Sequence, residues 1–259
     1  MKLLRFAIND SIYYGTLEKN MVSAIEGDIY TTFNVRKDRS YKLQDVKILP
    51  PVYPSKIIAI GINYRDHAQE FGHHIPDEPV LFIKPTTAVI GHDDAIVYPP
   101  SSSRVDFEAE IAAVVKKTAY RVSAEDSHEY ILGYTCLNDV TARDLQKKDG
   151  QWTRAKSFNT FCPIGPVIET DLDPNNVNIQ AQLNGETKQF SSTKNFIFPL
   201  FTLFSFISNI MTLLPGDIIT TGTPSGVGPM EPGDIIEIEI EGIGVLRNRV
   251  VADSTLVKG

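Results

Sequence analysis

Three carboxylate side chains, Asp106, Glu108 and Glu110, are spaced two residues apart near the start of an apolar run. In a β-strand, residues two apart point to the same face, so their Cα atoms would lie about 7 Å apart on one side. Like charges this close repel one another, and a solvated strand edge is one setting that tolerates them. The same strand runs on into residues 111–115, all of them Ile, Ala or Val, which predicts burial on both faces.

Carboxylates at the mouth of a buried strand are costly unless a cation neutralises them. A set of carboxylates offers only oxygen ligands, which suits a hard cation such as Mg²⁺, Mn²⁺ or Ca²⁺ rather than zinc. The segment therefore indicates a divalent-metal site, with a solvated strand edge as the alternative.

Asp139 is a candidate third ligand. It follows a predicted strand, Tyr134–Leu137, and precedes a predicted helix, Thr141–Lys148, for which Thr141 is the expected N-cap. The end of a strand is a common place for a functional side chain. The alternative is that Asn138 or Asp139 only shapes the turn.

Arg143 and Gln146 are three residues apart on this predicted helix and so share a face. The guanidinium group of Arg143 could bind a substrate carboxylate through two parallel hydrogen bonds. It could instead form an ion pair with Asp144 or Asp139.

His67 and Glu70 share a face of a short predicted helix, 63–71, that ends at Gly72. A carboxylate beside an imidazole fixes its tautomer and raises its basicity, as general-base catalysis requires. An exposed pair with no role is the alternative. Little apolar surface anchors the segment, so we expect it to act as a lid; His73 and His74 are read as loop residues rather than zinc ligands.

The elements that position these residues fall into two predicted domains. Residues 1–50 contain short candidate strands, and the proline-rich stretch 49–54 reads as a linker, which divides the chain into a small domain, 1–50, and a larger one, 51–259. The pentapeptide Pro-Gly-Asp-Ile-Ile occurs at 215–219 and 232–236 and predicts a turn before a strand in both places. The strands expected are 2–8, 12–17, 21–25, 57–60, 80–83, 111–115, 134–137 and 235–241, and the helices 63–71, 123–131, 141–148 and about 199–214.

The bulk composition narrows the function class. The 259 residues are 42% hydrophobic and 22% charged with a net charge of -7, and no Lys/Arg cluster exceeds a pair, so a nucleic-acid partner is not expected. Two cysteines without a CxxC motif and a charged N-terminus without a signal peptide predict a cytoplasmic protein. In the uncharged stretch 196–214, Pro199 suits a helix start and Pro215-Gly216 ends it, and the residues are apolar on one face, so we expect a core helix rather than a membrane span.

Five phrases in this order resemble the fumarylacetoacetate hydrolase family over roughly residues 50 to 250. That family includes acylpyruvate and fumarylpyruvate hydrolases, oxaloacetate decarboxylases and the isomerase of homoprotocatechuate breakdown. The phrases are Gly-Ile-Asn-Tyr-Arg-Asp-His at 61–67, Asp-Phe-Glu-Ala-Glu at 106–110, Asn-Asp-Val-Thr-Ala-Arg-Asp at 138–144, Ala-Lys-Ser-Phe at 155–158, and Thr-Gly-Thr-Pro-Ser-Gly-Val-Gly at 221–228.

The resemblance implies a β-rich α+β fold, a mixed β-sandwich roll with a small N-terminal domain, assembled as a homodimer and holding Mg²⁺ or Mn²⁺. It assigns the metal to Glu108, Glu110 and Asp139, and leaves Asp106 a supporting role at most. It makes Lys156 an active-site lysine, although an isolated lysine in a sequence is more often on the surface. It assigns substrate contacts to Arg143, Gln146 and Thr223, and water activation to His67 and Glu70.

The predicted function is therefore metal-dependent chemistry on a small 2-oxo acid. The reaction favoured is C–C bond hydrolysis of an acylpyruvate or fumarylpyruvate through a metal-bound enolate. The same enolate would serve an oxaloacetate-type decarboxylase or a 2-hydroxyhepta-2,4-diene-1,7-dioate isomerase. A non-catalytic β-roll that binds a small acid is a more distant alternative.

Overall fold

The computed structural model describes residues 1–66 and 75–253. The predicted helix 63–71 falls largely outside these residues, as do His67, Glu70 and the expected lid. No helix within the described ranges is both long enough and apolar enough to cross a membrane.

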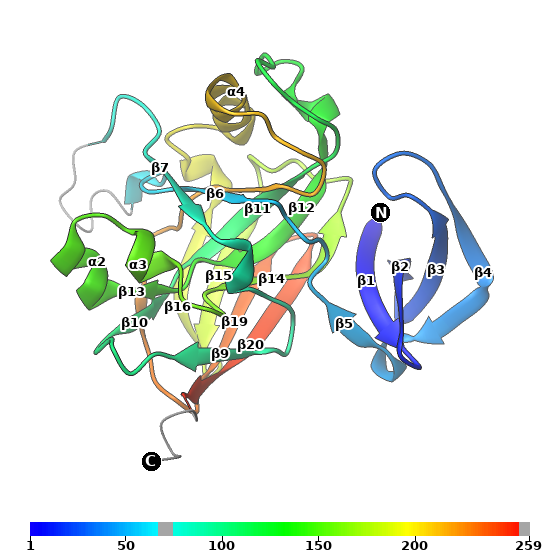
Figure 1. The fold of residues 1–259 in the computed structure, drawn as a ribbon, viewed down its shortest axis with the longest axis horizontal. Coiled ribbons are helices and arrows are strands. Elements are labelled where there is room, and N and C mark those ends of the chain that lie inside the picture. The colour runs from blue at the N-terminus through cyan, green and yellow to red at the C-terminus, as the bar shows by residue number, and fades with distance from the viewer. Residues whose placement is uncertain (67–74, 254–259) are drawn as a thin grey trace.

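The largest sheet takes its strands from β1 to β17 and begins with an antiparallel N-terminal lobe, drawn in blue in Figure 1. Strand β1 joins this lobe to the rest because Leu3 pairs with Ile168 of β14. Strand β4 was not predicted from the sequence because half of its residues are charged and they do not alternate with apolar ones. It pairs with β3 through the backbone. The lobe consists of β1 (Lys2–Ile8), β2 (Ser11–Glu18), β3 (Met21–Gly27), β4 (Phe33–Lys42), a 3-10 turn at Leu43–Asp45 and β5 (Lys47–Leu49).

The central strands of this sheet are almost fully buried. Every residue of β11 and β12 is buried, which confirms that the apolar run after Glu110 is covered on both faces. Strand β17 pairs in parallel with β6, and β7 forms the edge. From the N-terminal lobe outward the order is β14 (Cys162–Glu169), β12 (Ile131–Asn138), β11 (Ala109–Val115), β17 (Ile218–Thr220), β6 (Ile57–Ile60) and β7 (Leu81–Lys84), with the short β8 (Val89–Ile90) beside β14.

A second sheet packs against the first, so that β11 and β12 contact β15 and β19. In β19 the isoleucines at 236, 238 and 240 are buried and the intervening glutamates are not, which confirms the predicted alternation. The order is β16 (Glu186–Ser192), β15 (Asn178–Leu183), β19 (Ile235–Ile240), β20 (Gly244–Ala252) and β9 (Ala95–Tyr98). The architecture is thus the expected β-rich α+β fold, and the domain boundary near residue 50 stays a prediction.

A small third sheet corrects the prediction for residues 104–115. The single strand expected there is broken at Glu108: β10 (Val105–Phe107) pairs with β13 (Thr141–Ala142) and β18 (Gly228–Met230), while β11 belongs to the large sheet. The chain therefore changes sheets between Asp106 and Glu110.

The helices are short and lie over the outside of the sheets (Figure 1). The helix expected at 123–131 is wrong, because Ser123 and Asp126 hold a turn and Ile131 already pairs with Val115. Thr141 is a strand residue rather than the N-cap; its hydroxyl donates to the carbonyl of Asp139 at 2.8 Å. Among the described residues the helices are α2 (Arg143–Asp149), α3 (Thr153–Lys156) and α4 (Leu200–Ile210), with 3-10 turns at Thr86–Ala88, Ser127–Tyr130 and Thr193–Asn195.

Helix α4 confirms the predicted core helix but ends four residues early, because Leu213 forms a β-bridge with Ala119. Its face made of Leu200, Leu203, Phe204 and Ile207 is buried.

Candidate metal and substrate site

The break at Glu108 sets up the site. Two backbone N–H groups at this break donate to side-chain amides: that of Glu108 to Asn138 Oδ1 at 3.0 Å, and that of Ala109 to Gln189 Oε1 at 2.9 Å. The backbone N–H of Asp139 donates to the carbonyl of Glu108 at 2.9 Å, which joins the two carboxylate-bearing segments directly.

Glu108, Glu110 and Asp139 converge as the sequence suggested. Each offers a carboxylate oxygen, and these three atoms lie within 4.8 Å of one another. All three residues are buried, Glu110 at 1% exposure and Asp139 at 0%. Three buried oxygen donors at this separation fit a hard divalent cation. Asp106 lies outside the cluster.

Two buried lysines border the cluster. Lys156, at the end of α3, donates to Glu108 Oε2 at 2.9 Å and to Asp139 Oδ2 at 2.6 Å. Lys84, at the end of β7, donates to Asp139 Oδ1 at 2.5 Å and to the carbonyl of Val140 at 3.2 Å. Burial lowers the pKa of Lys156, but the charges of Asp139 and Glu108 outweigh it, so the pKa is raised and the ammonium form is favoured.

Of the three clustered carboxylates, Glu110 is the one whose negative charge is least balanced by neighbouring positive charges. Its Oε2 accepts from the hydroxyl of Thr220 and from the N–H of Gly222, the latter at 2.8 Å. In the described part of the chain, no ammonium or guanidinium group contacts it. Burial raises its pKa well above the usual value, and the charges of Asp139 and Glu108 raise it further. A divalent cation within the cluster would neutralise this side chain, which is why the residues fit such an ion.

Arg143 is held by a network that sequence analysis only half anticipated. It donates to Asp106 Oδ2 at 2.9 Å, to Gln146 Oε1 at 2.7 Å and to Glu108. The ion pair considered with Asp144 or Asp139 is therefore wrong, and Asp144 is bound by Ser102 and Ser103 instead. Asp106 also accepts hydrogen bonds from Arg104 at 2.8 and 3.2 Å. Its carboxylate therefore binds two guanidinium groups and helps to hold Arg143 in position.

Thr223 lies next to the cluster because the N–H of the preceding residue, Gly222, binds Glu110. Gly222 has a φ of +83°, and a Cβ there would lie 3.1 Å from the Cβ of Asn63. The side chain of Asn63 donates to the carbonyls of Thr221 at 2.8 Å and Phe198 at 3.1 Å. Thr223 itself accepts from Gln189 Nε2 at 2.9 Å.

Lys84, Asn63 and Gln189 were not assigned as site residues from the sequence. Asn63 stands in one of the five recognised phrases, and Lys84 is a charged residue that ends an apolar strand; both were available as signals. Gln189 lies in a polar strand and gives no signal of its own. The predicted water-activating pair, His67 and Glu70, lies outside the described residues.

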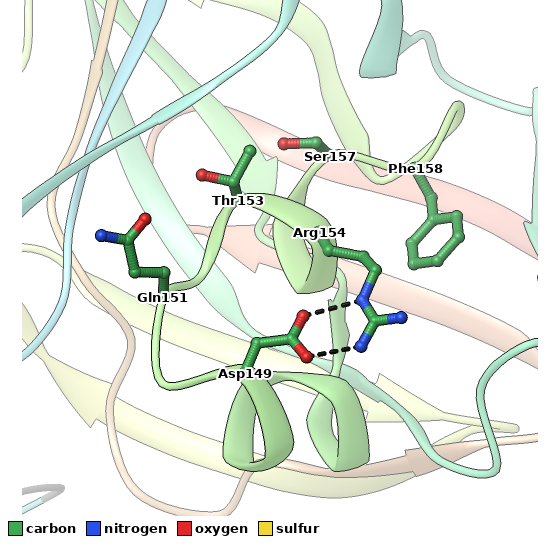
Figure 2. Close-up of a pocket in the computed structure, with 6 residues that line it drawn as sticks. All are labelled: Asp149, Gln151, Thr153, Arg154, Ser157 and Phe158. Carbon is green, nitrogen blue, oxygen red and sulfur yellow. Dashed lines mark hydrogen bonds and ion pairs between the residues drawn. The ribbon is translucent and has the colours of Figure 1, made fainter.

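A surface hollow beside α3 is separate from this cluster. It is lined by Asp149, Gln151, Thr153, Arg154, Ser157 and Phe158, and Arg154 donates to both oxygens of Asp149 (Figure 2). None of the clustered carboxylates lines it, and Lys156 on the same helix is buried on the inner side.

Comparisons with known families agree with this geometry. Residues 56–251 match the model for the fumarylacetoacetate (FAA) hydrolase C-terminal region, and residues 1–51 match the Rv2993c-like N-terminal model.

Three of the relatives that have descriptive names illustrate the range of activities. A mitochondrial oxaloacetate tautomerase of Bos taurus is 39% identical over 91% of this chain and 81% of its own. The crystal structure of a 2-hydroxyhepta-2,4-diene-1,7-dioate isomerase from Mycobacterium marinum is 42% identical with a TM-score of 0.92, covering 98% of this chain and 99% of that one. A fumarylacetoacetate hydrolase from Exiguobacterium antarcticum is 36% identical with a TM-score of 0.88, covering 98% and 100%.

Proposed function

The chain belongs to the fumarylacetoacetate hydrolase family, and we propose that it is a divalent-metal-dependent enzyme that interconverts the enol and keto forms of an oxaloacetate-type 2-oxo acid. The observation that carries the proposal is the contact of a buried lysine, Lys156, with two members of a buried carboxylate cluster that fits a cation. Such an arrangement places fixed positive charge beside the point where an enolate oxygen would develop negative charge.

The residues divide the work. A cation such as Mg²⁺, when bound to Glu108, Glu110 and Asp139, supplies a Lewis acid for the keto group and leaves coordination positions for the substrate. Lys156 is the cationic side chain that can neutralise the enolate oxygen and carry a proton at Nζ. Arg143 and Thr223 would bind the carboxylate of the acid, and the contact between Gln146 and Arg143 would orient the guanidinium group.

Tautomerisation needs nothing beyond this set, because only a proton moves once the enolate is stabilised. Hydrolysis needs an activated water as well, and the predicted pair for that task, His67 and Glu70, lies outside the described residues. The names of the bovine tautomerase and the Mycobacterium isomerase support the choice, since both reactions shift a proton without breaking a C–C bond.

C–C bond hydrolysis of an acylpyruvate or fumarylpyruvate is the second candidate. The Exiguobacterium protein, named as a fumarylacetoacetate hydrolase, supports it at 36% identity. The enolate of pyruvate would be the leaving group in that reaction, so the same cluster would serve. Decarboxylation of oxaloacetate would use the same electron sink.

A substrate panel tests the proposal. Purified protein with Mg²⁺ is mixed with oxaloacetate in its enol form, and the ultraviolet absorbance of the enol is followed while pyruvate is measured separately. We expect the enol signal to decay faster than in a sample without the protein, and no pyruvate to form. Oxalate, a planar mimic of the enolate of pyruvate, should inhibit this decay competitively. Acylpyruvates, fumarylpyruvate and the homoprotocatechuate-pathway dienoates complete the panel. Equal turnover of a simple ester without a 2-oxo acid would contradict the proposal.

His67→Ala separates the two candidates. Loss of a general base should slow hydrolysis of an acylpyruvate by about 10²–10⁴-fold. Enol–keto conversion should suffer much less, because it requires no activated water. An equal loss in both reactions would show that His67 does not act selectively on water.

A further inference from the structure

Gln189, on the inner side of β16, ties the metal-binding segment to the loop that carries Thr223. It is 1% exposed. Its Oε1 accepts from the backbone N–H of Ala109 at 2.9 Å, between the two glutamates of the cluster. Its Nε2 donates to Thr223 Oγ1 at 2.9 Å and to the carbonyl of Pro224 at 2.8 Å. One buried amide therefore bridges two parts of the site that are far apart in the chain.

The orientation of this amide is fixed by chemistry. A backbone N–H can only donate and a backbone carbonyl can only accept. The oxygen of Gln189 must therefore face Ala109, and its NH₂ group must face Pro224 and Thr223. Rotating the amide by half a turn would place two donors together at Ala109 and two acceptors together at Pro224.

This orientation determines what the hydroxyl of Thr223 can do. Since Oγ1 accepts a hydrogen bond from Gln189 Nε2, the hydroxyl hydrogen of Thr223 has to be donated to another group. Within residues 1–66 and 75–253, Thr223 Oγ1 has no acceptor for that proton. The hydroxyl is thus left as a donor, and its position beside the carboxylate cluster follows from the bond between Gly222 and Glu110.

The packing of the loop keeps this arrangement in place. Gly226 has a φ of +92°, and a Cβ at that position would lie 2.2 Å from the carbonyl oxygen of Lys188. The absence of a side chain lets the loop lie directly against β16, which brings Thr223 within reach of Gln189.

We propose that Gln189 is a positioning residue: by donating to Thr223 Oγ1 it commits the Thr223 hydroxyl to donate to a carboxylate of the bound acid. The direction of the donor chain runs from Ala109 N–H through Gln189 and Thr223 to the ligand. The last link of this chain rests on the proposed function, because it requires an anionic ligand beside the metal.

Oxalate binding measured by calorimetry in the presence of Mg²⁺ tests the proposal with four variants: Thr223→Val, Thr223→Ser, Gln189→Met and the double variant Thr223→Val/Gln189→Met. Thr223→Val should weaken oxalate binding about 10- to 100-fold, the usual loss for a hydrogen bond to a charged group, and Thr223→Ser should retain it. Gln189→Met should weaken it about 2- to 10-fold.

The double variant distinguishes a positioning role of Gln189 from a purely structural one. If Gln189 acts through Thr223, the double variant binds oxalate no more weakly than Thr223→Val alone, and its affinity for Mg²⁺ measured without oxalate stays at the wild-type level. If Gln189 only stabilises the fold, the two losses multiply or the Mg²⁺ affinity falls as well, and the proposal is wrong. Should Gln189→Met not fold, Gln189→Asn, whose shorter amide cannot reach both partners, takes its place in the same cycle. Failure of the wild-type protein to bind oxalate would instead overturn the proposed function.

Discussion

Both carboxylate oxygens of Asp139 accept a hydrogen bond from a buried lysine, Oδ1 from Lys84 and Oδ2 from Lys156. The two lysines differ in what else they contact. Lys84 has its second bond to the carbonyl of Val140, whereas Lys156 has its second bond to Glu108. Lys84 therefore holds Asp139 in place from strand β7, whereas Lys156 bridges two of the candidate ligands.

Removing Lys84 should cost stability in the metal-free protein. Lys84→Met leaves the charge of Asp139 short of one buried partner, so we expect the free energy of unfolding to fall by about 3–5 kcal/mol in urea denaturation. Added Mg²⁺ should restore part of the loss. Lys117→Met is the matched control, because its ion pair with Glu129 is exposed and should contribute about 1 kcal/mol or less. Equal losses in both variants would contradict the anchoring role.

Glu110→Gln tests the weakest-compensated carboxylate. The neutral amide keeps the side-chain shape while removing a charge that burial and two neighbouring carboxylates disfavour, so the metal-free melting temperature should not fall. The rise in melting temperature that Mg²⁺ produces in the wild-type protein should disappear. Glu129→Gln, on the surface, should keep that rise. A full Mg²⁺ response in Glu110→Gln would exclude it as a ligand.

The sequence was sufficient for the carboxylates and insufficient for the residues that hold them. Glu108 and Glu110 stand in one phrase with an alternating pattern, so their shared face could be inferred. Lys84 lies 55 residues from Asp139 and Gln189 lies 80 from Ala109, and such pairings depend on strand order that no local pattern reveals. The partners of Arg143 were mistaken for the same reason, since Arg143 begins helix α2 and its partner Asp106 lies on strand β10.

Among the secondary-structure elements, the break between β10 and β11 could not be predicted from the local sequence either. The alternation of carboxylates with other residues continues through the break and therefore does not mark it. Strands were predicted most accurately where all residues are apolar, as in β6. They were predicted least accurately where a strand with many charged residues pairs through its backbone, as in β4. The predicted helix at 123–131 failed because side-chain bonds to a turn outcompeted helical propensity.

The two Pro-Gly-Asp-Ile-Ile segments form turns, as predicted, and contain the same hydrogen bond to their aspartate, but the two aspartates differ in burial. Asp217 Oδ2 accepts from the N–H of Leu214 at 2.8 Å, and Asp234 Oδ2 from that of Glu231 at 2.7 Å. Asp217 is 0% exposed and also binds Ser55 and Lys56, which directly follow the predicted linker, while Asp234 has only Asn184 as a further side-chain partner among the described residues.

Replacement by alanine should separate the two turns. Asp217→Ala removes the acceptor of several part-buried hydrogen bonds, so we expect it to lower the free energy of unfolding by about 2–4 kcal/mol. Asp234→Ala should cost about 0.5–1.5 kcal/mol, as for one partly exposed set of hydrogen bonds. Chemical denaturation of both variants measures this, and similar losses would show that the contacts of Asp217 with Ser55 and Lys56 contribute little.

At the scale of the whole molecule, the site lies where the three sheets meet: β10 belongs to the small sheet, β11 and β12 to the large one, and Gln189 to the facing one. The cluster is therefore held by the packing of the sandwich rather than by any single loop. This arrangement explains how three carboxylates and two lysines can stay buried together.

The family resemblance predicts a homodimer. Strand β7 is an edge strand, and the apolar side chains of Val80 and Ile83 beside it are 43% and 49% exposed, a combination that edges of isolated sheets usually avoid. Light scattering should give a mass twice that of the 28.8 kDa chain. A single-chain mass across concentrations would rule the dimer out.

Glu108, Glu110 and Asp139 should hold one divalent cation to which a 2-oxo acid binds. Crystals grown with Mn²⁺ and oxalate test this, because the anomalous signal of manganese locates the ion without reference to any expected site. We expect one anomalous peak within about 2.2 Å of an oxygen from each of the three carboxylates, with oxalate completing the coordination. A peak elsewhere, or oxalate bound away from these carboxylates, would contradict it.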